Sequence, residues 1–121
     1  MSTPSVNPPA APAIPLSDDL RTAYIDLYSK LENEYQSNPD ATAREAIEPQ
    51  RDNVSNILTK DNMYRFNQDT ALFQALQAQI SSTTSGLKTL QTQINETASH
   101  FQTAASIVGA ITKVLGLLGS L

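Results

Sequence analysis

The feature that most constrains this chain is an apolar pattern that keeps one helical phase for more than six heptads. Apolar residues that alternate spacings of three and four lie on one stripe of an α-helix. A stripe of this length predicts coiled-coil-like packing in an all-α fold, a helical bundle. We call this stripe the seam; it contains Phe73, Leu76, Ile80, Leu87, Leu90, Ile94, Phe101, Val108, Ile111, Leu115 and Leu118.

The positions that flank the seam carry no Asp, Glu, Lys or Arg. In leucine zippers, ion pairs at these positions select the partner helix and its orientation. Such selection is excluded here, so we expect an intramolecular bundle or a broad assembly face rather than a parallel zipper.

Two shorter helices are predicted before the seam. The first spans about 17–37, where Ser17 is a good N-cap. The second spans about 40–59, with a bend expected near Ala46 because Pro49 lies inside the helix. A third helix is expected to begin after Asp61 or Asn62 and to cover 62–118. Residues 1–16 carry no charge and hold five of the seven prolines, which predicts a disordered, extended leader before a single helical domain at 17–121.

One stretch argues against an unbroken third helix. Residues 81–86 read Ser-Ser-Thr-Thr-Ser-Gly, whose summed helix propensity is roughly 3–4 kcal/mol worse than that of alanine. A turn here would give an up-down four-helix bundle, whereas a continuous helix would be about 85 Å long and would leave part of the seam uncovered. The constant heptad phase favours the continuous helix.

The composition excludes the common catalytic and metal-binding arrangements. The chain has no Cys and one His, His100, so disulfides, thiolate nucleophiles and Cys- or His-rich metal sites are excluded. Its four glycines do not form a phosphate-binding loop, and a net charge of −4 argues against general affinity for nucleic acid. We therefore expect no enzyme activity, no cofactor or metal, no small-molecule substrate and no nucleic-acid partner.

Charge is concentrated in the first half of the chain. Residues 17–69 contain 17 of the 20 charged side chains, whereas residues 70–121 contain only Lys88, Glu96 and Lys113. Ser, Thr or Gln occupy 18 of the 37 positions from 70 to 106. Because solvated helix faces usually carry Lys and Glu, this neutral surface is suited to contact with protein or lipid, or is simply an uncharged soluble face.

The C-terminal segment 104–121 is the most apolar part of the chain, and Lys113 is its only charge. Three interpretations remain open: the buried centre of a bundle, an assembly face, or a helix that lies on or enters a membrane. In composition it resembles the amphipathic helices of membrane-active peptides and pore-forming toxins. The Ser/Thr/Gln-rich helix before it resembles in texture the helices of secreted bacterial filament and translocator proteins. The candidate membrane or partner face is Ile107, Val114, Leu117 and Leu121.

These patterns predict a non-enzymatic helical interaction protein that assembles with itself or with a larger protein partner through the seam. The alternative is a membrane-active protein whose helix at 104–121 binds or enters a lipid bilayer. The start of the chain lacks the features of a secretory signal peptide, which makes the cytoplasm the default location. Export by a signal-independent bacterial system, or membrane association, is compatible with the same sequence.

Overall fold

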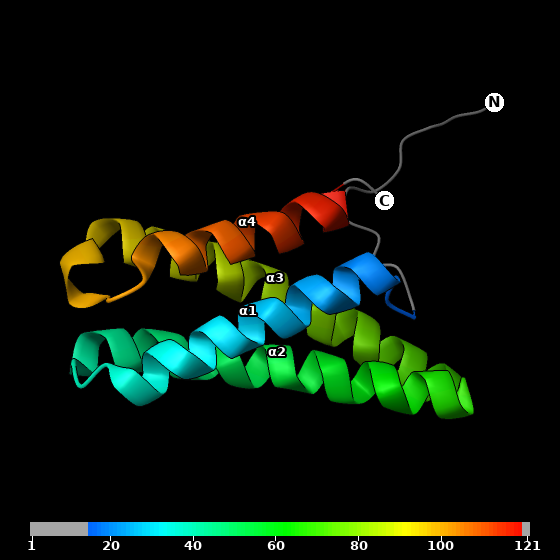
Figure 1. Cartoon of the computed structure of the whole chain (residues 1–121). Coiled ribbons are helices and arrows are strands. Elements are labelled where there is room, and N and C mark those ends of the chain that lie inside the picture. Colours follow the sequence, from blue (N-terminus) through cyan, green and yellow to red (C-terminus); the bar gives the residue numbers. More distant parts are fainter. Residues whose placement is uncertain (1–14, 120–121) are drawn as a thin grey trace.

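The computed structural model describes residues 15–119, and within that range the chain forms four α-helices and no β-strand (Figure 1). The prediction of an all-α helical bundle is confirmed. The residues predicted as the leader lie outside the described residues, apart from Pro15 and Leu16. The elements are α1 (Asp18–Ser37), α2 (Ala41–Asn67), α3 (Thr70–Glu96), the short 3-10 helix η1 (Ala98–His100) and α4 (Ala104–Gly119).

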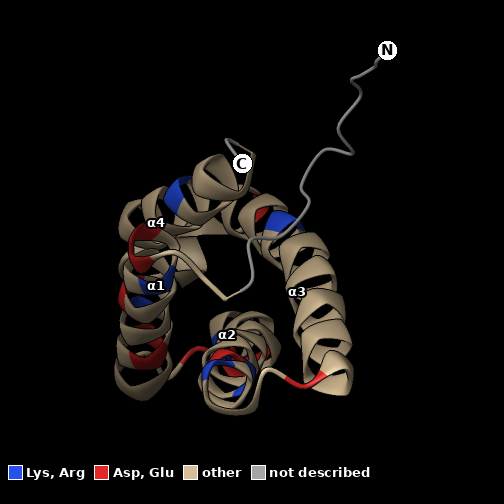
Figure 2. Ribbon diagram, turned by 90° about the vertical axis from the view of Figure 1, so that its right-hand side faces the viewer, with Lys and Arg blue, Asp and Glu red and all other residues tan. Residues whose placement is uncertain are grey.

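The four helices form a ring in which each helix contacts the helices on either side of it, α4 contacting α1 to close the ring. In Figure 2, α1 and α3 lie on opposite sides, with α4 above and α2 below. Apolar side chains from all four helices fill the centre as one cluster. Its fully buried members include Tyr24, Leu27, Leu31, Ile47, Val54, Ile57, Leu76, Leu87, Leu90, Ile107, Ile111 and Val114.

Helix α2 is longer than predicted: it runs through Pro49 and ends at Asn67 rather than near residue 59. Asp61 does not begin a new helix, because its buried carboxylate accepts hydrogen bonds from Arg21 and Arg65, both at 2.7 Å. The real break is at Gln68, whose φ of 52° is left-handed and ends the helix. Asp69 then caps α3 by accepting from the N–H of Ala71.

The prediction that the helix continues through residues 81–86 is correct, because α3 is unbroken there. Thr83 is fully buried between Ile80 and Leu87, which are also in the core. Burying a large aliphatic side chain contributes about 1.5–3 kcal/mol, so two of them offset the poor helix propensity of the stretch. Gly86 also helps, because its missing Cβ leaves room for the side-chain amide of Gln50 on α2.

The prediction of one helix up to residue 118 is wrong. The chain leaves α3 after Glu96, passes through η1 and starts α4 at Ala104, so the two halves of the seam fold back on each other. The turn begins after Glu96, ten residues beyond the end of the stretch of poor helix formers. A carboxylate on α1, described in the next section, holds this corner in place.

Leu16 does not belong to an extended leader, because its side chain is only 2% exposed and lies in the core. Its N–H donates to Asp61 Oδ1 at 2.9 Å, and its carbonyl accepts from the guanidinium of Arg65. The two arginines that bind Asp61 neutralise its charge, which makes burial of the carboxylate tolerable. This cluster attaches the start of α1 to the last turns of α2.

The hydroxyl of Tyr24 is buried and has no hydrogen-bond partner among residues 15–119. Burial raises the pKa of Tyr24 far above its ordinary value. An unpaired buried hydroxyl costs about 1–3 kcal/mol, so replacing Tyr24 by Phe should leave the free energy of unfolding unchanged or raise it by about 1 kcal/mol. Urea unfolding followed by circular dichroism measures the difference.

The control is Tyr24→Ala, which leaves a cavity and should lower the free energy of unfolding by about 3–5 kcal/mol. A loss of more than about 1 kcal/mol in Tyr24→Phe would mean that the hydroxyl is paired in solution.

Candidate interaction surface

The corner between α3 and α4 is held by the carboxylate of Glu34, which lies on α1 and is 1% exposed. Glu34 Oε2 accepts from the N–H of Gln102 at 2.7 Å. Glu34 Oε1 accepts from the N–H and the hydroxyl of Thr103, at 3.0 and 2.7 Å. A negative charge at the start of α4 also interacts favourably with the helix dipole. Glu34 therefore fixes where α4 begins and how it is directed across α1.

Polar contacts from the α1–α2 turn support the same corner. The side-chain amide of Asn38 donates to Glu34 Oε2 at 2.7 Å and to the carbonyl of His100 at 2.8 Å. His100 Nδ1 lies 2.7 Å from Asp40 Oδ2, and this contact lowers the pKa of the Asp40 carboxyl. The single histidine therefore contacts Asp40, the N-cap of α2. Together with Asn38, this contact connects the α1–α2 turn to the turn between α3 and α4.

Burial alone would raise the pKa of Glu34, because a charged carboxylate is poorly solvated in the protein interior. The hydrogen bonds from Gln102, Thr103 and Asn38 outweigh that effect and lower the pKa below its ordinary value of 4.5. Glu34 is therefore ionised at neutral pH, when its acceptor oxygens hold the turn most strongly.

An apolar groove lies beside this corner, between the end of α3 and the start of α4, with a volume of about 470 Å³. Ile94 and Val108, both seam residues, face it from the two helices. Of these two, Ile94 is buried at the base of the groove, whereas Val108 is half-buried and is only partly covered by the chain itself. The remaining lining is small or polar, comprising Asn95, Ala98, Ala104, Ala105 and Gly109.

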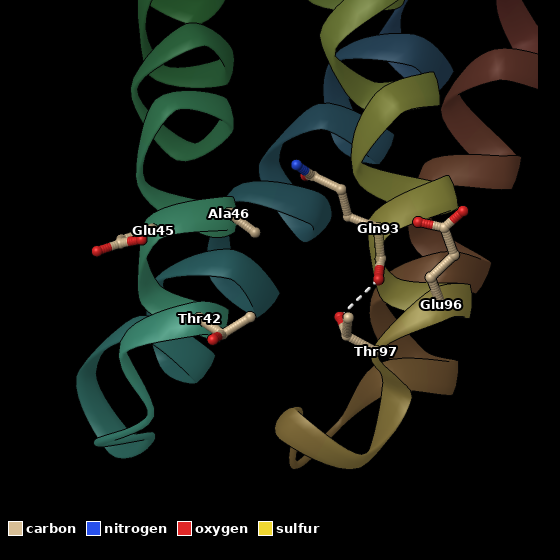
Figure 3. Close-up of a pocket in the computed structure, with 6 residues that line it drawn as sticks. All are labelled: Thr42, Glu45, Ala46, Gln93, Glu96 and Thr97. Atoms are coloured by element: carbon tan, nitrogen blue, oxygen red, sulfur yellow. Dashed lines mark hydrogen bonds between the residues drawn. The ribbon is translucent and has the colours of Figure 1, made fainter.

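A second pocket of about 280 Å³ lies on the other side of α3, against the start of α2 (Figure 3). Thr42 and Ala46 line it from α2, Gln93 lines it from α3, and Thr97 lines it from the C-cap of α3. Two acidic residues at its rim, Glu45 and Glu96, point away from the space between the helices (Figure 3). The two carboxylates do not converge, so the pocket has no obvious binding chemistry.

Most of the seam is the inner face of the bundle. Eight of its eleven residues are buried, and the three that are half-buried are Phe73, Val108 and Leu115. The residues singled out as a membrane or partner face are not displayed either, since Ile107 and Val114 are fully buried. Leu117 is half-buried, and Leu121 lies outside the described residues.

The outward face of α4 is instead small and neutral. Apart from Lys113, its exposed positions are Ala105, Ser106, Gly109, Thr112, Gly116 and Gly119. A Cβ atom added at Gly109 would have no heavy atom within 4 Å, so this part of the surface is open.

Phe66 lies one heptad before Phe73, the first residue of the seam, yet it is 87% exposed. Met63, one turn earlier, is 45% exposed. The spacing of seven between Phe66 and Phe73 is a coincidence, because the chain turns between them: Phe66 is on α2 and Phe73 is on α3. No signal in the sequence marked that turn apart from Asp69, a common capping residue.

Two further classes of site are absent from the part of the chain that is described. Between Pro15 and Gly119, no three His, Cys, Asp or Glu side chains come together in a way that could hold a metal ion. None of the helices in that range has the length and apolar content needed to cross a bilayer. Compared with protein-family models, curated proteins and solved structures, the chain matches none of them.

The role of Glu34 predicts acid-sensitive stability. Because its pKa is lower in the folded protein, its contribution is complete above about pH 4.5 and is lost as the pH falls through the folded-state value. Glu34→Gln leaves donors at the turn unpaired, so it should lower the free energy of unfolding by about 1–3 kcal/mol at pH 7 and by less at pH 3. Urea unfolding at several pH values measures this convergence.

A matched control is Glu48→Gln, because the exposed Glu48 carboxylate lies 4.0 Å from Arg51. Exposed ion pairs contribute at most about 1 kcal/mol, so the free energy of unfolding of this variant should stay close to that of the parent at every pH. If the deficit of Glu34→Gln were the same at pH 3 and pH 7, the ionised carboxylate would not be what holds the turn.

Proposed function

We propose that this chain is a non-enzymatic helical interaction protein that pairs with a second copy of itself across α4. The observation that carries this proposal is the apolar groove between Ile94 on α3 and Val108 on α4. A groove between two helices is a common site for an additional helix, which is held by apolar contact.

The chemistry of the groove favours a neutral occupant. Asn95 is the only side chain in its lining with a polar group, and Lys113 is the only charged residue on α4. A highly charged partner would have its charges desolvated without compensation. Apart from Lys113, the outward face of α4 is itself uncharged and made of small residues, so it has the properties that the groove requires.

The small residues of that face allow two helices to come close together. Helix axes in proteins are about 8–10 Å apart, and small contact residues favour the short end of that range. In an antiparallel pair centred on Gly109, Lys113 of one copy would lie opposite Ala105 of the other, so the two lysines would not meet. One patch would serve both copies, as two-fold symmetry requires.

The expected dimer is weak. Helix α4 has 16 residues and is about 24 Å long, so the paired surface would be at the low end of specific interfaces. Interfaces of that size are typical of transient complexes.

The test is Gly109→Arg, which places a long charged side chain where the second copy would lie. No heavy atom lies within 4 Å of the added Cβ, and arginine is the better helix former, so the fold should be retained. We expect the dissociation constant to rise at least about tenfold, equal to about 1.4 kcal/mol. Sedimentation equilibrium over a range of concentrations measures this constant.

The control is Gly119→Arg, which adds the same charge at an equally open position at the end of α4. In a pair centred on Gly109 it would lie opposite residue 99, before the start of the other α4, and so outside the paired stretch. It should dimerise like the parent. A parent chain that stays monomeric at the highest concentrations, or a dimer unaffected by Gly109→Arg, would contradict the proposed pairing.

A second candidate function is membrane association through α4, which has one charge among its 16 residues. Because Ile107, Ile111 and Val114 are buried, α4 would have to leave the bundle to place them in lipid. Co-sedimentation of the full chain with anionic vesicles tests this candidate. Recovery of the chain with the vesicles, together with loss of native tertiary structure, would favour it over pairing.

A further inference from the structure

The last turn of α2 displays two apolar side chains to solvent. Phe66 is 87% exposed and Met63 is 45% exposed. They are three residues apart in the helix, so they lie on the same face. The buried residues of this part of α2, Ile57 and Asp61, lie on its opposite face, toward the core. We refer to Met63 and Phe66 as the α2 tip patch.

The N-terminal segment of the chain begins at the same end of α2. The N–H of Leu16 donates to Asp61 and its carbonyl accepts from Arg65, which directly precedes Phe66 in sequence. The side chain of Leu16 is buried, so this attachment is firm. The described part of the chain therefore begins beside the last two turns of α2.

The composition of residues 1–14 suits an exposed aromatic surface. The segment is uncharged and contains four prolines together with Val6 and Ile14. The sequence Pro9-Ala10-Ala11-Pro12 has the Pro-x-x-Pro spacing, and Pro12 and Pro15 repeat it. Segments of this kind bind aromatic side chains in a polyproline II conformation, which costs little entropy to order.

We propose that the proline-rich segment of this chain docks on its own α2 tip patch, with Pro9–Pro12 against Phe66. The geometry permits it. A helix is about 10–12 Å across, so half of its circumference is about 17 Å, and a polyproline II chain rises about 3.1 Å per residue. A chain of five or six residues counted back from Pro15 is therefore long enough to extend to the far side of α2, which corresponds to residues 9–10.

A second copy is a poorer occupant of this patch. A stable dimer buries about 800 Å² on each partner, and two side chains fall well short of that area. A tethered segment needs less surface, because its effective concentration at the patch is high.

The absence of cysteine in the chain allows a direct test. Ser5→Cys in the full chain carries a nitroxide spin label, and the paramagnetic broadening of backbone amides 62–67 is measured by NMR in the ¹⁵N-labelled protein. We expect strong broadening that falls severalfold on adding Phe66→Ser. The matched control is Ile25→Ser, at a position on α1 that is 48% exposed, and it should leave the broadening unchanged.

Two results would overturn the proposal. In the first, broadening at residues 62–67 is the same with and without Phe66→Ser, which means that the segment is near α2 only because it is tethered there. In the second, two samples are mixed: protein that carries the spin label but no ¹⁵N, and ¹⁵N-labelled protein that carries no spin label. Broadening of amides 62–67 in this mixture would mean that the segment of another copy occupies the patch. Docking within one chain is supported if Phe66→Ser removes the broadening and the mixed sample shows no broadening.

Discussion

The hydrogen bonds to the Glu34 carboxylate are the interaction on which the arrangement of the second half of the chain depends. One side chain on α1 binds two backbone N–H groups and a hydroxyl at the corner before α4. Buried donors and acceptors that lack partners are costly, so the corner and Glu34 stabilise each other. The heptad pattern itself runs through the corner without interruption, so the turn depends on this contact and on the burial of Ile107, Ile111 and Val114 in the core. With both, α4 returns along α1 and closes the ring.

Closing the ring changes what the seam does. A continuous helix would have offered its apolar stripe to another chain, whereas the folded seam buries eight of its eleven residues against the chain itself. What remains at the surface is a short groove near the corner and a neutral, small-residue face on α4. The proposed pairing uses this groove and this face of α4. The second buried carboxylate, Asp61, has a similar role at the opposite end, where it attaches Leu16 and α1 to α2.

The sequence-based predictions succeeded where structure is set by residues close in sequence and failed where it is set by residues far apart in sequence. Local periodicity placed α1 within a residue at each end, because its apolar stripe and its Ser17 cap are encoded nearby. Asp61 misled the prediction, because a carboxylate near an apolar run is typical of a helix start. Here it pairs with Arg21, which is 40 residues away in sequence. The groove could not be predicted for the same reason, since Ile94 and Val108 form it only after the chain has turned between them.

The sequence by itself determined the all-α class, the positions that face a core and the neutral character of the second half. These properties follow from side-chain spacing and chemistry, which act over one or two helical turns. The tertiary structure alone decided where the long apolar pattern turns, which apolar residues stay exposed and where a groove remains. Those outcomes depend on contacts such as Glu34 with Thr103, 69 residues apart. A heptad pattern has the same period on both sides of a turn, so it contains no information about where such a contact will bend the chain.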